Sequence, residues 1–295
     1  MVDVHKYHGT GNDFVVVDAA EEVTDRRAFA VDLCDRTDGI EPPRGEAGTT
    51  GADGVLFLSL ETAYSPPRVV MTLVQPDGSI AAMCGNGARV AARWAADRTG
   101  SDEVMIDTPS GTRHAVLDRE AGEVTVEMGR PTFDPSGVPV DSSEPFVERE
   151  VEGLTVTAVN TGVPHAVAFV EDVADVDVEA VAPPVRHADV FPRGANVTFA
   201  SERAAGYDQR TFERGVEGET RSCGTGAVAV AAVANRLGHV ETDDPVTVSL
   251  PGGDLEVTVT DSGSTLRGPV TFEFEGSVTP VAPRRLDDQI AGDDD

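Results

Sequence analysis

The sequence predicts an α+β protein of two similar lobes, each a β-sheet wrapped around a central helix, with a site between the lobes. A repeated phrase is the first observation: residues 84–96 read CGNGARVAARWAA and residues 223–235 read CGTGAVAVAAVAN, with six identities in thirteen positions. The second observation is that strand patterns on both sides of this phrase also occur twice. Internal duplication with mixed strands and helices indicates two lobes of one topology.

The elements follow the same order in both halves of the chain. Residues 10–18, TGNDFVVVD, and residues 161–172, TGVPHAVAFVED, each place a Thr-Gly turn before a β-branched strand. The cysteine phrase then opens an alanine- and valine-rich run of helical length. Further on, residues 108–129 and 250–268 each place a glycine turn before two strands, which predicts a hairpin.

The lobes are expected to join where MGRPTFDPSG concentrates turn-forming residues. The first lobe is then residues 1–128 together with 269–282, because a last strand is expected to return to it, and the second lobe is residues 129–268. Residues 134–150 are rich in Pro, Ser and Glu and are predicted to connect the lobes loosely. Residues 283–295 are predicted to be an acidic, disordered tail.

The charge balance excludes several classes of partner. Acidic residues number 52 against 23 basic residues, for a net charge of −29. Without a basic surface to neutralise phosphates, neither nucleic acid nor an anionic membrane is an expected partner. The acids lie within patterned apolar sequence, so we expect a folded protein adapted to a salt-rich, halophilic cell interior, where salt screens the repulsion.

The cysteines and the N-terminus predict a cytoplasmic protein. The chain has three cysteines, which cannot all pair, and the segment MVDVHKYHGTG lacks the features of a secretion signal. No apolar run approaches the roughly 18 residues of a membrane span. Whether the protein is a monomer or a homodimer is left open.

Lysine and histidine usage indicates chemistry without a cofactor or a metal. Pyridoxal phosphate enzymes need a Schiff-base lysine, and the only lysine, Lys6, falls in the expected first strand. The six histidines form no ligand cluster beyond His5-x-x-His8, and the sequence contains no C-x-x-C. We therefore expect no metal and no cofactor.

Cys84 and Cys223 are the main candidates for chemistry. A thiol at the first turn of a helix lies among unpaired N–H groups, which is expected to lower its pKa toward neutrality. Two such thiols facing one site are the acid and base that a racemase or epimerase needs. The alternatives are two buried core cysteines or a thiol redox switch. Cys34, which has no neighbouring glycines, is expected to lie in the core.

The glycines after Cys223 also fit the dinucleotide pattern G-x-G-x-x-A. That motif must follow an apolar strand, whereas ERGVEGETRS is charged, so the pattern is rejected. In the same segment Glu213 and Arg214 lie near Cys223 in sequence, and an arginine there suits a substrate carboxylate. His165 follows the Thr-Gly turn of the repeat, which makes a site role and a core role about equally expected.

Six segments together resemble the diaminopimelate epimerase family: KYHGTGNDFVVVD, QPDGSIAAMCGNGAR, VNTGVPHAVAFVED, FPRGANVTF, FERGVEGETRSCGTGA and LRGPVTFEFEG. The resemblance covers nearly the whole chain in the right order. It implies interconversion of LL- and meso-diaminopimelate in lysine biosynthesis, by a two-lobed isomerase without pyridoxal phosphate or metal. The substrate is then a small molecule.

The resemblance also assigns roles to residues. Cys84 and Cys223 match the acid/base pair, and His165 and Glu213 match residues that adjust the thiol pKa values. The matching substrate-binding positions are Asn12, Gln75, Gly85, Asn86, Asn196, Glu213, Arg214, Gly224 and Thr225.

Two positions depart from the family pattern. Gln75 stands where asparagine is frequent, and Val163 replaces an asparagine that contacts substrate. Each change affects a hydrogen bond worth about 0.5–1.5 kcal/mol, so recognition of the distal end of the substrate is altered but not lost. A proline or hydroxyproline racemase-like enzyme is the nearest alternative. Its first cysteine is followed by Gly-His, whereas here Gly85-Asn86 follows Cys84.

Overall fold

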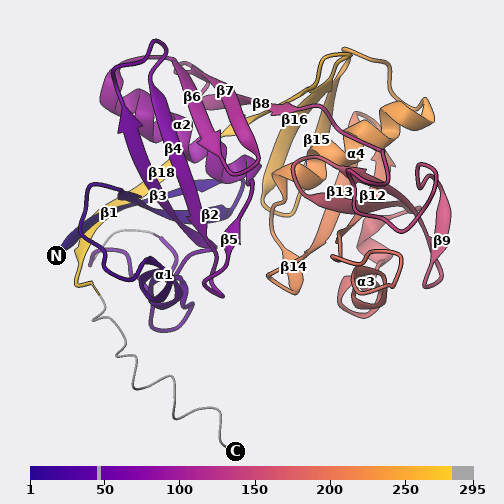
Figure 1. Ribbon diagram of the computed structural model, residues 1–295, viewed down its shortest axis with the longest axis horizontal. Helices are drawn as coiled ribbons and strands as arrows, with labels where there is room; N and C mark the ends of the chain where they lie inside the picture. Colours follow the sequence, from indigo (N-terminus) through magenta and orange to yellow (C-terminus); the bar gives the residue numbers. More distant parts are fainter. Residues whose placement is uncertain (45–47, 281–295) are drawn as a thin grey trace, which may run out of the picture.

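The computed structural model describes residues 1–44 and 48–280, which form two lobes of similar topology side by side (Figure 1). The predicted tail, residues 283–295, lies outside the described residues. The first lobe contains β1 (Val2–Gly9), β2 (Asn12–Asp18), α1 (Arg26–Cys34), β3 (Gly54–Glu61), β4 (Arg68–Val74), β5 (Ile80–Ala81), α2 (Gly85–Thr99), β6 (Glu103–Thr108), β7 (Gly111–Asp118) and β8 (Glu123–Gly129). The second contains β9 (Arg149–Val151), β10 (Leu154–Asn160), β11 (Pro164–Phe169), the 3₁₀ turn η1 (Val173–Asp175), α3 (Val178–Arg186), β12 (Asn196–Arg203), β13 (Gly206–Glu213), β14 (Gly218–Thr220), α4 (Gly224–Leu237), β15 (Pro245–Leu250), β16 (Gly253–Val259) and β17 (Ser264–Pro269). The last strand is β18 (Thr271–Val278).

The predicted duplication is confirmed strand by strand. In the first lobe β1 and β2 are antiparallel, β2 and β3 parallel, and β3 and β4 antiparallel. The second lobe repeats this order with β10, β11, β12 and β13. After α2, strand β6 pairs in parallel with β4 and continues through antiparallel pairings into β7 and β8. After α4, strand β15 pairs in parallel with β13 and continues in the same way into β16 and β17.

Each sheet wraps around one central helix, as predicted. Helix α2 packs against β1, β4, β6, β7 and β8, and α4 packs against β10, β11, β15 and β16 among others. Both helices are buried nearly all round, which suits their alanine- and valine-rich sequences. Both end at a glycine in the left-handed conformation, Gly100 with φ 73° and Gly238 with φ 80°, a backbone state that glycine adopts without strain.

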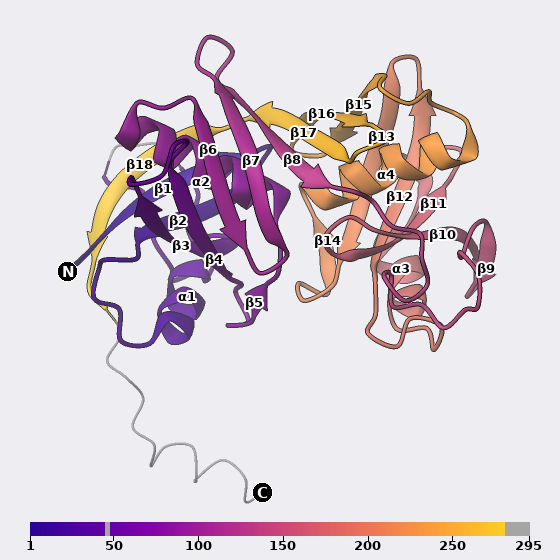
Figure 2. The same ribbon diagram turned by 45° about the horizontal axis from the view of Figure 1, so that its top comes forward.

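Strand pairing links the two lobes. Strand β17 leaves the second lobe and pairs with β8 of the first, and β18 then pairs along β1 (Figure 2). The end of the described chain therefore returns to the first lobe. The exact lobe boundaries, residues 1–128 with 269–282 and residues 129–268, stay a prediction.

The prediction that residues 134–150 connect the lobes loosely is wrong, because the apolar side chains of this segment are packed into a core. Val138, Val140 and Phe146 are buried and belong to the core that β10, β11, β12 and α3 enclose. Composition suggested a loop, but three apolar side chains spaced among prolines and serines are enough to fix a segment on a core.

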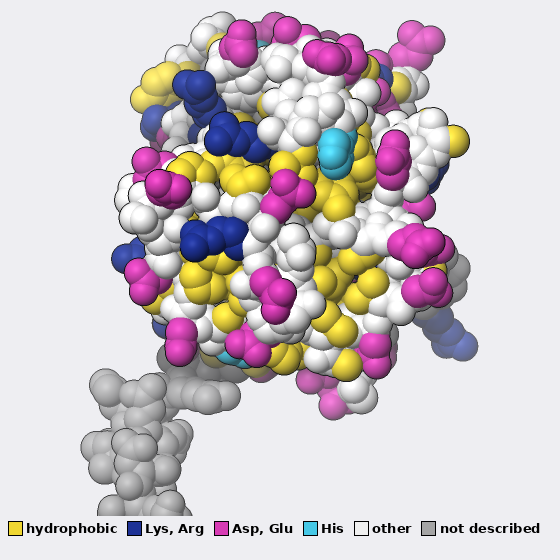
Figure 3. Space-filling view, turned by 90° about the vertical axis from the view of Figure 1, so that its right-hand side faces the viewer, with side chains coloured by type: hydrophobic (Ala, Val, Ile, Leu, Met, Phe, Trp, Pro, Cys, Tyr) yellow, Lys and Arg dark blue, Asp and Glu magenta, His cyan; other side chains and the backbone are white. Residues whose placement is uncertain are grey.

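The surface carries the acidic excess. Figure 3 shows acidic side chains scattered over the face of the second lobe, among fewer basic ones. No single basic patch stands out on this face. The scatter fits the sequence argument for repulsion spread evenly over a folded protein.

Candidate active site

The two helices of the repeat point their N-termini at each other. Cys84 and Cys223 are the N-cap residues of α2 and α4, both with extended backbone, at φ −146° and −126°. The next residues are glycines that nearly touch, since a methyl group added at Gly85 would lie 3.5 Å from the Cα atom of Gly224. A methyl group at Gly85 or Gly224 would also lie 2.7 or 2.9 Å from Cδ2 of Leu266, so glycine at both positions leaves room for this side chain. The unpaired N–H groups of both first turns therefore converge on one place.

A pocket of about 360 Å³ opens at this junction and is lined by both lobes. Both cysteines line it. Among the predicted site residues, the pocket wall also includes Asn12, Gln75, Gly85, Asn86, Asn196, Glu213, Arg214, Gly224 and Thr225. His165 does not line it.

Burial governs the charge state of the thiols. It raises the pKa of Cys84 to about 11, although the Gly87 N–H donates to Sγ at 3.3 Å and opposes the rise. Burial also raises the pKa of Cys223 well above its ordinary value, and the carboxylate of Glu213 adds to this. The expectation of a thiol pKa near neutrality is therefore wrong for the resting site. The helix N-terminal N–H groups favour the thiolate, but removal from water disfavours it more strongly.

Glu213 lies beside Cys223 on the pocket wall. Its carboxylate accepts a hydrogen bond from the Thr220 hydroxyl at 2.5 Å, and both Thr220 and the Cys223 thiol act to lower the pKa of Glu213. Desolvation outweighs these effects and raises the pKa of Glu213 from 4.5 to about 6. A carboxyl with a pKa near neutrality next to a reacting thiol is suited to adjust the proton balance of that thiol.

The raised pKa of Glu213 predicts a pH-dependent stability change. Its pKa in the folded protein lies above the usual 4.5, so the folded state binds the proton more tightly and stability falls as pH rises from about 4.5 to 6. Glu213→Gln removes this cost, so we expect the free energy of unfolding to exceed that of the wild type by about 2 kcal/mol above pH 6 and to match it near pH 4. Denaturant unfolding at pH 4 and pH 8 measures the difference. An equal difference at both pH values would contradict the assignment.

His165 lies one side chain behind the pocket. It is fully buried, with its ring nitrogens 3.0 Å from the Thr198 hydroxyl and 3.1 Å from the Thr225 hydroxyl. Desolvation lowers the pKa of His165 to about 3, so the ring is neutral. The Thr225 hydroxyl is in turn 3.5 Å from the sulfur of Cys223. Any influence of His165 on Cys223 therefore passes through Thr225.

Asn12 is held by a carboxylate that sequence reasoning missed. Its Nδ2 donates to Asp53 at 2.7 Å, and its Oδ1 accepts from Nδ2 of Asn86 at 3.1 Å and lies 4.0 Å from the sulfur of Cys84. Asp53 lines the pocket and is itself paired with Arg36. No local motif marks Asp53, because it reaches Asn12 only through the parallel pairing of β2 with β3.

Polar groups also gather on the pocket wall around Arg214 and Gln75. The backbone N–H of Arg214 donates to Oδ1 of Asn196 at 2.8 Å, and Nη1 of Arg214 donates to a main-chain carbonyl at 3.2 Å. Opposite, the Oε1 atom of Gln75 accepts from the Ser79 hydroxyl at 3.1 Å. Val163 contributes an apolar wall.

The remaining candidate groups lie apart from the pocket. Lys6 is fully buried in β1 and paired with Asp13 at 2.8 Å, and Cys34 is a buried core residue, as predicted. Across residues 1–44 and 48–280, no three His, Cys, Asp or Glu side chains are grouped as a metal site requires. In the same ranges, no helix combines the length and hydropathy of a membrane span.

The fold recurs in solved structures. A hydroxyproline epimerase from Agrobacterium vitis matches with a TM-score of 0.65 at 19% identity, over 94% of this chain and 90% of that chain. A phenazine biosynthesis protein of the PhzF family from Bacillus anthracis matches with a TM-score of 0.65 at 14% identity, over 94% and 99%. At these identities the likeness shows the fold.

Fold, site and relatives define an isomerase that acts on amino acids. A family model described as diaminopimelate epimerase matches residues 4–133 and 157–273. The chain belongs to the diaminopimelate epimerase family. The diaminopimelate epimerase of Methanocella arvoryzae is 42% identical over 283 residues, covering 92% of this chain and 95% of that protein. That of Archaeoglobus fulgidus is 38% identical over 279 residues, covering 92% and 94%.

Proposed function

We propose that this protein interconverts LL- and meso-diaminopimelate by proton transfer between two thiols and the substrate α-carbon. The observation that carries the proposal is that Cys84 and Cys223, each the N-cap of a repeated helix, line one pocket from opposite lobes. Inversion at a carbon needs a base on one face and an acid on the other, and this arrangement supplies one thiol for each face.

The proton balance of the proposed reaction is simple. One cysteine, as thiolate, takes the α-proton, and the electron pair of the broken C–H bond stays on the substrate as a planar carbanion. The opposite thiol then gives its proton to the other face, which leaves that sulfur as the thiolate. In the reverse direction the two cysteines exchange roles. Both transfers use side chains of this chain, so the scheme needs no cofactor.

The helix N-termini suit the α-carboxylate of the substrate. Charge develops there as the carbanion forms, and the N–H groups of Gly85, Asn86, Gly224 and Thr225 are oriented before the reaction begins. Their effect is strongest where water is excluded. Cys223 is buried and Cys84 is half-buried, so water has limited access to this part of the pocket.

The polar groups around Arg214 support a substrate with a second polar end. Arg214 offers a positive charge to a distal carboxylate, with Asn196 and Gln75 as amide partners. The names of the relatives agree with diaminopimelate, which has such a second carboxylate, whereas proline does not.

We place the reaction in lysine biosynthesis and, because it needs free thiols, in the reducing cytoplasm.

Proton exchange with solvent tests the proposal. The protein is incubated in D₂O at high salt with diaminopimelate and, separately, with proline. We expect deuterium at the α-carbon of diaminopimelate together with inversion, and no exchange into proline. Exchange into proline alone would favour the racemase-like alternative. No exchange into either substrate, together with a thiol titration that responds to oxidant, would favour a redox switch.

A further inference from the structure

Arg89 is a buried positive charge without a counter-ion. It lies on α2 with no exposed surface, and its guanidinium makes one hydrogen bond, from Nη2 to the Thr10 hydroxyl at 3.3 Å. Its Nε and Nη1 atoms have no hydrogen-bond partner, and no carboxylate of residues 1–44 or 48–280 lies within 4.0 Å. Burial of an unpaired charge opposes folding, so the presence of Arg89 at this position calls for a function.

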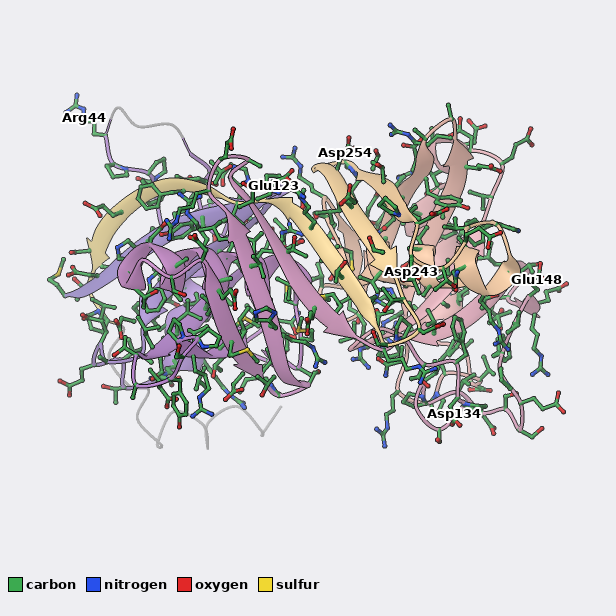
Figure 4. The ribbon with its side chains drawn as sticks, turned by 90° about the horizontal axis from the view of Figure 1, so that it is seen from above. Arg44, Glu123, Asp134, Glu148, Asp243 and Asp254 are labelled. Atoms are coloured by element: carbon green, nitrogen blue, oxygen red, sulfur yellow. The ribbon has the colours of Figure 1, made fainter. Side chains whose placement is uncertain are left out.

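The fold leaves space for this guanidinium at the junction of the lobes. A methyl group at Gly9 would lie 2.8 Å from Nη2 of Arg89, and one at Gly268 would lie 3.3 Å from Cζ. Gly268 belongs to β17, the strand that crosses to the first lobe and pairs with β8. Glu123, at the start of β8, lies beside this crossing and is paired with Arg267 (Figure 4). Two glycines from two strands therefore accommodate one cation.

A chain of hydrogen bonds runs from Arg89 to both cysteine turns. Thr10, which accepts from Arg89, is 2.6 Å from the hydroxyl of Ser222, the residue before Cys223. The same Ser222 hydroxyl accepts from Nδ2 of Asn86 at 3.0 Å, and Asn86 lies two residues after Cys84. The cation thus connects to residues next to each thiol, one in each lobe.

Arg89 is the cation among the groups that act on the sulfur of Cys84. Besides desolvation, the Gly87 N–H favours the thiolate and the Glu213 carboxylate disfavours it, and the Asn86 N–H and the charge of Arg89 then also favour it. Cys223 lies at the start of α4, and the charge of Cys84 disfavours ionisation of the Cys223 thiol. Arg89 in turn interacts with Cys84 and Glu123. Its charge therefore acts on the sulfur from the interior, where screening by water is weak.

We propose that Arg89 is a positioning residue that supplies the resident positive charge for the Cys84 thiolate and holds the two cysteine turns in register. The inference rests on the proposed two-thiol function. Arg89 does not line the pocket, so it acts through Cys84 and not on the substrate.

Alkylation of Cys84 tests the proposal without using catalysis. The rate of modification by iodoacetamide follows the thiolate fraction and is read for each cysteine by peptide mass spectrometry, with substrate absent. We expect Arg89→Met to slow modification of Cys84 about tenfold at pH 8, and Arg89→Lys, which keeps the charge, to stay near the wild type. Arg93→Met is the matched control, because Arg93 is on the same helix, paired with Asp97 and partly exposed.

Stability and kinetics separate this role from a structural one. The methionine replaces an unpaired charge, so Arg89→Met should unfold at the same denaturant concentration as the wild type or at a higher one. Its kcat should be lower than that of the wild type, and its KM should change little. An unchanged rate of Cys84 modification in Arg89→Met would overturn the proposal. A loss of stability or of folding in Arg89→Met would also overturn the proposal, because it would show that the role of Arg89 is structural. If the wild type exchanges no proton on diaminopimelate but the modification rates differ as expected, the proposed function fails and the charge effect stands.

Discussion

Replacing either Cys84 or Cys223 by alanine is expected to lower the rate of epimerisation by about 10³-fold or more. Each thiol serves one face of the α-carbon, and a methyl group neither accepts nor donates a proton. The remaining thiol still reaches its own face. A single variant is therefore expected to exchange the α-proton of only one epimer with solvent, without inverting it, and the other variant is expected to exchange only the other epimer.

Deuterium incorporation and optical inversion are measured in parallel on each purified epimer. Cys34→Ala is the matched control, since Cys34 is buried in the core at the end of α1 and its replacement should leave the rate unchanged. Substantial inversion by either single variant would reject the two-thiol mechanism. Exchange of both epimers by one variant would show that a single group reaches both faces.

A methyl group at the contact between the helices is expected to have the second largest effect. In Gly224→Ala the new Cβ atom would lie 2.9 Å from Cδ2 of Leu266 and 3.0 Å from Oδ1 of Asn86. Both atoms are ends of side chains, so Leu266 and Asn86 must shift, and Asn86 is the residue that bonds Asn12 and Ser222 beside the two thiols. A shift of about 1 Å costs about 10²-fold in rate, so we expect kcat/KM to fall by that factor. The free energy of unfolding should fall by only about 1–3 kcal/mol, as for other overpacked sites.

Kinetics and denaturant unfolding of the same samples separate the two effects. Gly85→Ala should behave like Gly224→Ala, because its Cβ atom would lie 2.7 Å from the same Leu266 side chain. Gly276→Ala is the control, since a methyl group there meets nothing within 4 Å. If the two helix variants kept wild-type kcat/KM, the close approach of the N-termini would have no catalytic importance.

Local sequence was most informative where one short segment contained both the structural and the chemical signal. Cys-Gly-x-Gly-Ala before an apolar run predicted both central helices and both thiols, because a cap, its glycines and its helix are contiguous. It was least informative where the partner lies far along the chain. Asp53 contacts Asn12 across 41 residues, and Ser222 contacts Thr10 across 212. No spacing rule reports such pairs.

The thiol pKa likewise depends on one effect that local sequence predicts and on another that only the packing of the fold determines. From the sequence, a cysteine at a helix N-terminus should be acidic, and the N–H groups do act in that direction. Burial, which depends on how two lobes close over the pocket, acts the other way and is stronger. The environment of His165 also followed from packing, since its burial behind Thr225 keeps it out of the pocket.

Contiguous residues were enough to predict the duplication, the two central helices, the paired thiols and the family, because local geometry follows from backbone chemistry. The protonation state of those thiols, the bond between Asn12 and Asp53 and the burial of Arg89 followed from the assembled fold. All three depend on segments distant in sequence coming together, and desolvation of the thiols and of Arg89 arises only when they do.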